Sequence, residues 1–134
     1  MPPRLLITGS RTWVDRKVIH EALRDWWDST GRDPEAVLVS GKCPKGADRI
    51  CEEIWAKNGL TLELHPAKWR KPDGSKDWRA GFTRNEVMVD TGPDHLIAFI
   101  MDGSTGATHC LNYAREKGIP VTVYEDSSEP GRGD

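Results

Sequence analysis

Apolar and polar positions follow one another along the chain in a pattern that predicts strands and helices in strict turn. Short apolar runs predict strands at residues 5–8, 37–39, 60–65, 95–100 and 121–124. Apolar residues at helical spacing predict helices between the strands, at residues 15–28, 47–58, 81–90 and 107–117. We therefore expect a single domain over residues 1–125 and a flexible polar tail over residues 126–134.

The helical spacing also predicts which side chains face the core. In the first helix we expect one buried face made of Val14, Val18, Ala22, Leu23 and Trp26. In the last helix we expect Cys110, Leu111 and Ala114 to point inward.

The strands themselves indicate their places in a sheet. Strands that alternate with helices form parallel sheets through right-handed crossovers. The runs at 5–8 and 95–100 are continuously apolar, which is typical of central strands covered on both faces. The runs at 60–65 and 121–124 alternate, which is typical of edges, and we expect Leu64 to point inward. This favours an α/β fold, a Rossmann-like three-layer sandwich with a five-stranded parallel sheet in the order 3-2-1-4-5.

In such a sheet, ligands bind beyond the carboxyl ends of the strands, at the crevice between strands one and four. Small-residue loops follow three strands there, and two of them lead directly into helices. Unpaired amides at helix N-termini favour anions, glycines let a phosphate approach the backbone, and hydroxyls and arginines add donors. From these loops we predict the ligand-binding residues Gly9, Ser10, Arg11, Gly41, Lys42, Gly46, Ala47, Asp48, Gly103, Ser104, Thr105, Gly106 and Thr108.

The loop from Gly41 to Gly46 has the glycine spacing of a phosphate-binding P-loop. Ala47 and Asp48 stand where that motif requires Lys and Ser or Thr, so a P-loop NTPase is excluded. Asp48 allows two interpretations. A carboxylate in the first turn stabilises the helix through its interaction with the helix dipole, and a carboxylate at this place can also accept a hydrogen bond from a ribose hydroxyl.

The long loop at residues 66–80 and the helix after it add further candidates. Arg84 and Asn85 lie on a helix whose Phe82 and Met88 would face the core, which would turn Arg84 or Asn85 toward the crevice. Trp69 and Trp78 lie in the loop, where a tryptophan can stack on a base, act as a lid or serve as packing. We include Trp69, Arg84 and Asn85 among the ligand-binding candidates.

The net charge and the cysteine content argue against several classes of protein. The net charge of -2 argues against a general nucleic-acid binder, although a basic loop with two interleaved tryptophans keeps single-stranded DNA binding as an alternative. The three cysteines contain no C-x-x-C pair, so we expect neither a disulfide framework nor a metal site. Without a signal peptide or a membrane-spanning run, we expect a cytoplasmic protein, and exposed edge strands make a homodimer plausible.

Five motifs appear in an order that resembles the YspA/cpYpsA-related branch of the SLOG superfamily, small Rossmann-like proteins of bacteria and their phages. The likeness covers about residues 4–125. It implies a nucleotide or nucleotide-derived ligand, such as an ADP-ribose-like molecule, held by the strand-end loops of a sensor or ligand-processing module. The motifs are Ile7–Arg11, Ser40–Asp48, Pro66–Trp69, Ala80–Met88 and Gly103–Thr108.

The superfamily also contains the LOG phosphoribohydrolases, which cut a nucleoside monophosphate, and the DNA-binding DprA proteins. The LOG motif Pro-Gly-Gly-x-Gly-Thr-x-x-Glu falls on residues 102–110, and its catalytic glutamate position holds Cys110. A buried thiol cannot replace a carboxylate electrostatically. If the chain is an enzyme, we expect a nucleotide or N-glycosidic hydrolase, with Asp48 and Asp102 as catalytic candidates and Glu86 as a further carboxylate near the crevice.

Overall fold

The computed structural model describes residues 2–127 and contains strands and helices in strict turn. The strands are β1 (Arg4–Gly9), β2 (Val37–Ser40), β3 (Thr61–Leu64), β4 (His95–Met101) and β5 (Val121–Asp126). The helices are α1 (Arg16–Ser29), α2 (Ala47–Lys57), α3 (Ala80–Asp90) and α4 (Thr105–Glu116). All the predicted elements are therefore present, with boundaries that differ by a few residues.

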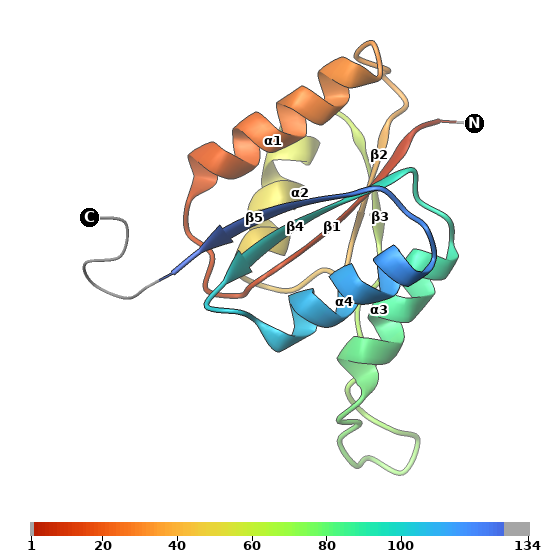
Figure 1. Ribbon diagram of the computed structural model, residues 1–134. Coiled ribbons are helices and arrows are strands. Elements are labelled where there is room, and N and C mark those ends of the chain that lie inside the picture. Colours follow the sequence, from red (N-terminus) through yellow and green to blue (C-terminus); the bar gives the residue numbers. More distant parts are fainter. Residues whose placement is uncertain (1, 128–134) are drawn as a thin grey trace.

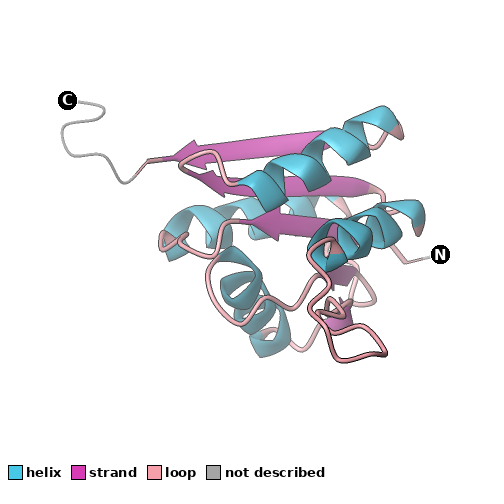
Figure 2. Ribbon diagram, turned by 90° about the horizontal axis from the view of Figure 1, so that it is seen from below, coloured by secondary structure: helices cyan, strands magenta, loops and turns pink. Residues whose placement is uncertain are grey.

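The strands form one parallel sheet in the order β3-β2-β1-β4-β5, which confirms the predicted fold. In Figure 2 the arrowheads of the strands seen in full point the same way, as parallel pairing requires. The order places β1 and β4 side by side in the centre, with Leu6 paired to Leu96 and Gly9 to Phe99. Both strands lead toward the same end of the sheet, so the segments that follow them meet there.

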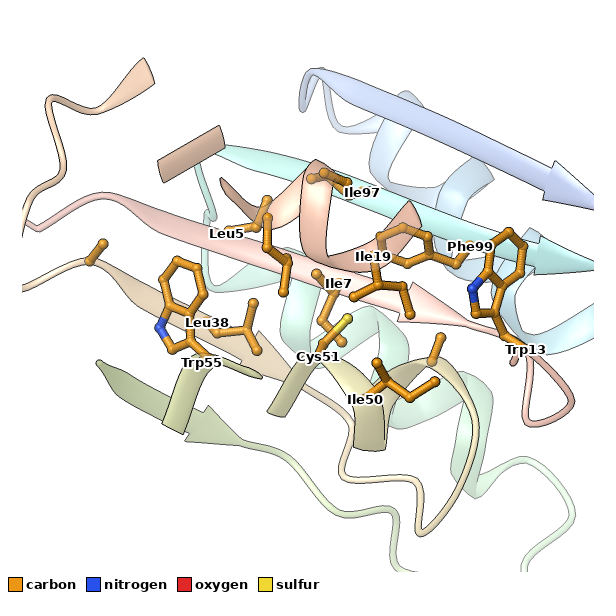
Figure 3. Close-up of a cluster of buried hydrophobic side chains, with 14 of the residues drawn as sticks. Leu5, Ile7, Trp13, Ile19, Leu38, Ile50, Cys51, Trp55, Ile97 and Phe99 are labelled. Atoms are coloured by element: carbon orange, nitrogen blue, oxygen red, sulfur yellow. The ribbon is translucent and has the colours of Figure 1, made fainter. Parts of the chain in front are cut away.

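Two helices cover each face of the sheet, and each face has its own apolar cluster (Figure 1). On the face of α1 and α2, Ile19, Cys51 and Trp55 pack with Leu5 and Phe99 of the central strands (Figure 3). On the other face, α3 and α4 pack on alternate residues of the same strands. This second cluster includes Leu6, Met88, Val89, Leu96, Cys110, Leu111 and Ala114. Burial on both faces explains why β1 and β4 are apolar without interruption.

Three of the predicted inward positions are wrong. Phe82 belongs to neither apolar cluster, because its ring packs against the His109 ring instead, 4.6 Å away between centroids. Val14 is 76% exposed, because α1 begins only at Arg16 after its cap Asp15, and Ile19 is buried instead. Leu64 is 37% exposed, at the end of a short edge strand. Its neighbour Glu63 is half-buried instead, because Glu63 forms an ion pair with Arg4.

The last strand is longer than its apolar run. Glu125 and Asp126 continue β5 and pair with Ile100 and Met101, although both were expected to follow the strand. The predicted tail at 126–134 lies outside the described residues from residue 128 onward, and the division at 125/126 stays a prediction.

Candidate functional site

A pocket of about 750 Å³ lies where the segments after β1, β2, β3 and β4 meet, at the carboxyl ends of the strands. This volume falls in the range of small-molecule sites. Most of the predicted ligand-binding residues line the pocket, namely Gly9, Ser10, Arg11, Gly41, Lys42, Asp48, Trp69, Arg84, Asn85, Ser104 and Gly106. The predicted residues that lie outside the lining are Gly46, Ala47, Gly103, Thr105 and Thr108, together with the catalytic candidate Asp102.

Ser10 joins the ends of the two central strands. Its hydroxyl accepts from the Met101 amide at 2.7 Å and donates to the Met101 carbonyl at 3.3 Å, and the residue is only 2% exposed. Its carbonyl accepts from the Ala47 amide at 3.1 Å, at the start of α2. Ser10 therefore holds the base of the pocket together through contacts within the protein.

Three of the predicted glycines are required by packing. A Cβ at Gly9 would meet the side chains of Ala47 and Phe99, and one at Gly46 would meet the backbone of Ser10 and Arg11. A Cβ at Gly41 would meet the guanidinium of Arg84, which lies flat against that glycine. These glycines bring protein segments together, rather than leaving their Cα atoms open to a phosphate.

The start of α4 is open by comparison. A Cβ at Gly103 or Gly106 would meet nothing within 4 Å, and Gly106 and Ala107 line the pocket. Ser104, which precedes the helix, makes no side-chain capping bond. The Ser104 amide donates to the Met101 carbonyl at 3.3 Å, and the Thr108 amide donates to the Ser104 carbonyl at 3.0 Å. The amides of residues 105–107, between these two, are those that a helix leaves without a partner of its own, and they favour an anion.

Arg84 and Asn85 connect the two sides of the pocket. The Arg84 guanidinium donates to the Gly41 carbonyl at 2.5 Å and to the Asn85 side-chain oxygen at 2.9 Å. Asn85 is 4% exposed and donates to the Gly106 carbonyl at 3.2 Å. Consecutive residues of α3 thus hold the end of β2 and the start of α4, while part of the guanidinium faces the pocket.

Asp48 places a buried carboxylate at the pocket. The residue is 6% exposed and accepts from the Cys43 amide at 3.2 Å. Burial raises the pKa of the Asp48 carboxyl to about 6, although the Cys43 amide and the charges of Arg84 and Arg11 act in the opposite direction. A carboxyl that titrates this close to neutral pH can exchange a proton under ordinary conditions, as a general acid or base must.

Arg11 and Lys42 lie exposed at the rim, and both line the pocket. The Arg11 guanidinium is 5.8 Å from the ring centroid of Trp69, a cation–π distance. Lys42 adopts a positive φ of 55°, and its amide donates to the Ser40 hydroxyl at 3.2 Å. Both cations can therefore approach an anion in the pocket without breaking an ion pair within the described residues.

Cys110 lies in the LOG glutamate position, on the buried face of α4, and is fully buried. Burial raises the pKa of its thiol to about 12, and the hydrogen bond from Thr8 only partly opposes that shift. A neutral, enclosed thiol cannot stabilise a developing positive charge. The structure thus leaves no carboxylate at the place where LOG enzymes carry one.

The other candidate carboxylates lie away from the pocket. Asp102 is exposed, has a positive φ of 53°, and accepts from the Ser127 hydroxyl at 3.2 Å. Glu86 pairs with His109 across α3 and α4 at 3.2 Å. Neither is in the lining, so Asp48 is the catalytic candidate that the pocket contains.

Several lining residues were missed from the sequence. Pro66 and Ala67 lie two and three residues after the end of β3, so the rule that ligands bind beyond strand ends could have found them. Others give no local signal, because only the packing of distant segments brings them together. Trp78, for which the sequence left stacking on a base, a lid or packing open, also lines the pocket. The remaining additional residues are Ile7, Thr8, Thr12, Cys43, Pro44, Pro66, Ala67, Gly81, Phe82, Met88, Met101 and Ala107.

Between residues 2 and 127, no three His, Cys, Asp or Glu side chains are grouped so that they could hold a metal ion. None of the helices in this part of the chain has the length and apolar character needed to cross a membrane.

Comparison with known proteins gives two matches. The family model described as YspA, cpYpsA-related SLOG family matches residues 3–71. The Gene 61 protein of Mycobacterium phage D29 is 37% identical over 131 residues, an alignment that covers 92% of this chain and 97% of the phage protein. The family match includes the segments after β1 and β2, and the phage relative extends the similarity over nearly the whole chain.

Proposed function

Because the chain belongs to the YspA, cpYpsA-related SLOG family, we propose that its pocket binds a nucleotide or nucleotide-derived ligand. The binding would serve a sensor or a ligand-processing module. The observation that carries the proposal is the pocket at the carboxyl ends of β1 and β4, which joins an open helix N-terminus, two arginines and a buried carboxylate.

Each of these groups has a part in the proposal. The amides at the start of α4 and the Ser104 hydroxyl receive a phosphate, because they are donors at the positive end of a helix dipole. Arg11 and Arg84 add charge to the same anion. Asp48 accepts from a sugar hydroxyl, which a partly desolvated carboxylate does well.

Thermal unfolding with added ligand tests the proposal. ADP-ribose, AMP, NAD and cyclic nucleotides are the probes, each at concentrations up to millimolar. A ligand at about 100 times its Kd adds about 2.7 kcal/mol, which raises the Tm of a domain of this size by roughly 10 °C. If no probe shifts the Tm, the proposal is wrong.

A pair of arginine variants shows whether a shift comes from this pocket. Arg11 is exposed, so Arg11→Ala should leave the fold intact and weaken binding of the active probe about tenfold or more. Arg24→Ala, an exposed arginine of α1 outside the pocket, should leave binding unchanged. Equal effects of the two substitutions would mean that the ligand binds elsewhere.

A hydrolase of nucleotides or N-glycosidic bonds is the second candidate, and the raised pKa of Asp48 favours it. Chromatography of AMP and ADP-ribose incubated with the protein would reveal a released base or phosphate. Asp48→Asn should abolish release while the probe still stabilises the protein. Binding without product in the unmodified protein would leave a binding module and reject the hydrolase.

A further inference from the structure

The segment between β3 and α3 forms a small hairpin at the edge of the pocket. We call residues Trp69–Trp78 the tryptophan hairpin. Arg70 and Lys76 form an antiparallel bridge, and the Asp77 amide donates to the Trp69 carbonyl at 2.6 Å. Figure 1 shows this segment extending away from the sheet at the start of α3. The bridge holds the two tryptophans at its base near each other, and both line the pocket.

The indole of Trp69 packs against the start of α3. A Cβ at Gly81 would lie 3.2 Å from its ring, so the indole packs closely on the first turn of α3. The Arg11 guanidinium lies near the ring, at 5.8 Å from its centroid. Trp69 nevertheless remains 39% exposed, which leaves part of the indole open to the pocket.

Trp78 is far more exposed. The residue is 76% exposed, and the described contact of its ring is with the Lys76 ammonium at 4.4 Å from the centroid. Leaving most of an indole in water gives up a large hydrophobic gain, since each buried Å² of apolar surface is worth about 25 cal/mol. Trp78 lines the pocket, as Phe82 does.

The pocket therefore offers two different surfaces. At the start of α4 it presents amides and a hydroxyl, which suit an anion. At the tryptophan hairpin it presents flat aromatic rings, which suit another flat ring. We propose that Trp69 and Trp78 form the seat for a nucleobase, the planar end of the ligand whose phosphate lies at α4. This inference rests on the proposed function, and it adds which residues select for the base.

The charge of the whole chain favours a small ligand over a nucleic-acid strand. The hairpin and the flanking Lys68 and Arg79 together carry five cations and the two carboxylates Asp73 and Asp77. The chain as a whole nevertheless has a net charge of -2, and phosphate neutralisation by excess cations is what drives the binding of a strand. A single base needs only the indole faces.

Calorimetric titration with AMP, ADP-ribose and ribose 5-phosphate tests the inference, because ribose 5-phosphate has the sugar and phosphate of AMP without its base. We expect AMP or ADP-ribose to bind more tightly than ribose 5-phosphate. Trp78→Ala should weaken the base-bearing probe by about 5- to 150-fold, the range of a lost base–aromatic stack, and leave ribose 5-phosphate within twofold. Trp78→Phe should restore most of the affinity, because it keeps a ring.

Controls separate the two proposals. Val87→Ala removes an exposed apolar side chain of α3 outside the pocket and should change no affinity. If a base-bearing probe binds and Trp78→Ala leaves its Kd within twofold, or if ribose 5-phosphate binds as tightly as AMP, the base seat is wrong and the proposed function stands. If none of the three probes binds the unmodified protein, the base seat is wrong, and the proposed function fails with it if NAD and the cyclic nucleotides also leave the Tm unchanged.

Discussion

The segment from β2 to α2 and the segment from β4 to α4 look alike in the sequence, since each carries two glycines between the end of the strand and the first turn of the helix. In the first loop, Gly41 lies under the Arg84 guanidinium and Gly46 lies against the backbone of Ser10 and Arg11. In the second loop, Gly103 and Gly106 face open space. One loop is closed by protein, and the other is open to a ligand.

The difference shows that a glycine near a strand end has two separate uses. In the first loop it allows two segments of the protein to touch, and this contact shapes the base of the pocket. In the second loop no neighbouring atom lies close enough to Gly106 to exclude a side chain there. A helix would be more stable with alanine there, so the space itself is the feature that ligand binding would use.

The largest effect is expected at Gly46, in the closed loop. Gly46→Ala combines a strained φ of 77° with a clash against the backbone of Ser10, and should cost about 3 kcal/mol of unfolding free energy. Gly92→Ala has the same φ of 77° with nothing within 4 Å, and should cost only about 1 kcal/mol. Urea unfolding of both variants measures the difference. Equal losses would mean that Gly46 is needed for its backbone conformation alone.

The next largest effect on stability is expected at Asp48, in the first turn of α2 after the closed loop. Its raised pKa means that the folded protein holds a proton between the ordinary pKa of 3.8 and about 6, where the unfolded chain has released it. The carboxyl therefore destabilises the fold progressively as the pH rises through this window, by about 2–3 kcal/mol once the pH is above 6.

Asp48→Asn should remove this cost, because the amide stays neutral and its oxygen can still accept from Cys43. Urea unfolding should find the variant more stable than the unmodified protein at pH 8 by about 2 kcal/mol, and equally stable at pH 4. A gain of the same size at both pH values would show that the charge of Asp48 is not its cause.

The smallest change in stability is expected at Gly106, in the open loop. Gly106→Ala should leave the unfolding free energy unchanged or raise it by up to about 1 kcal/mol, because alanine is the better helix former. Binding of AMP or ADP-ribose should weaken about tenfold, since a methyl group would occupy the approach to the α4 amides. Unchanged affinity would remove the distinction between the two loops.

Gly41→Ala is the matched substitution in the closed loop. It should lower stability and affinity together, because the added methyl displaces Arg84 from the Gly41 carbonyl. Only Gly106→Ala is expected to separate the two quantities. Unfolding curves and titrations of the two variants, taken side by side, make this comparison direct.

The fold could be predicted because its signals are local. The residues of a strand themselves indicate whether one or both of its faces are buried, as the continuous apolar runs Leu5–Ile7 and Leu96–Ile100 do. The number of buried faces in turn indicates whether the strand lies at the centre or at the edge of the sheet. The errors lie at element ends, where local pattern is weakest. Val14 precedes its helix, and Leu64 ends an edge strand.

The place of the candidate pocket could also be predicted, but the contacts that its residues make could not. The strand-end rule placed Ser10 and Gly41 in one crevice, and the helical pattern of the segment before the fourth strand turned Arg84 toward it. Neither could show that the Arg84 guanidinium covers a glycine 43 positions earlier in the chain, or that the Ser10 hydroxyl is used by Met101. These contacts depend on how separate segments pack, and no spacing within one segment encodes them.

The three cysteines differ in accessibility in a way that has a practical use. Cys51 and Cys110 are buried, whereas Cys43 is partly exposed and lines the pocket beside Asp48. A thiol-reactive reagent should therefore modify the native protein first at Cys43, without any engineered residue. The rate of that alkylation would report whether the pocket is occupied, and a compound library could be screened by the protection that each member gives.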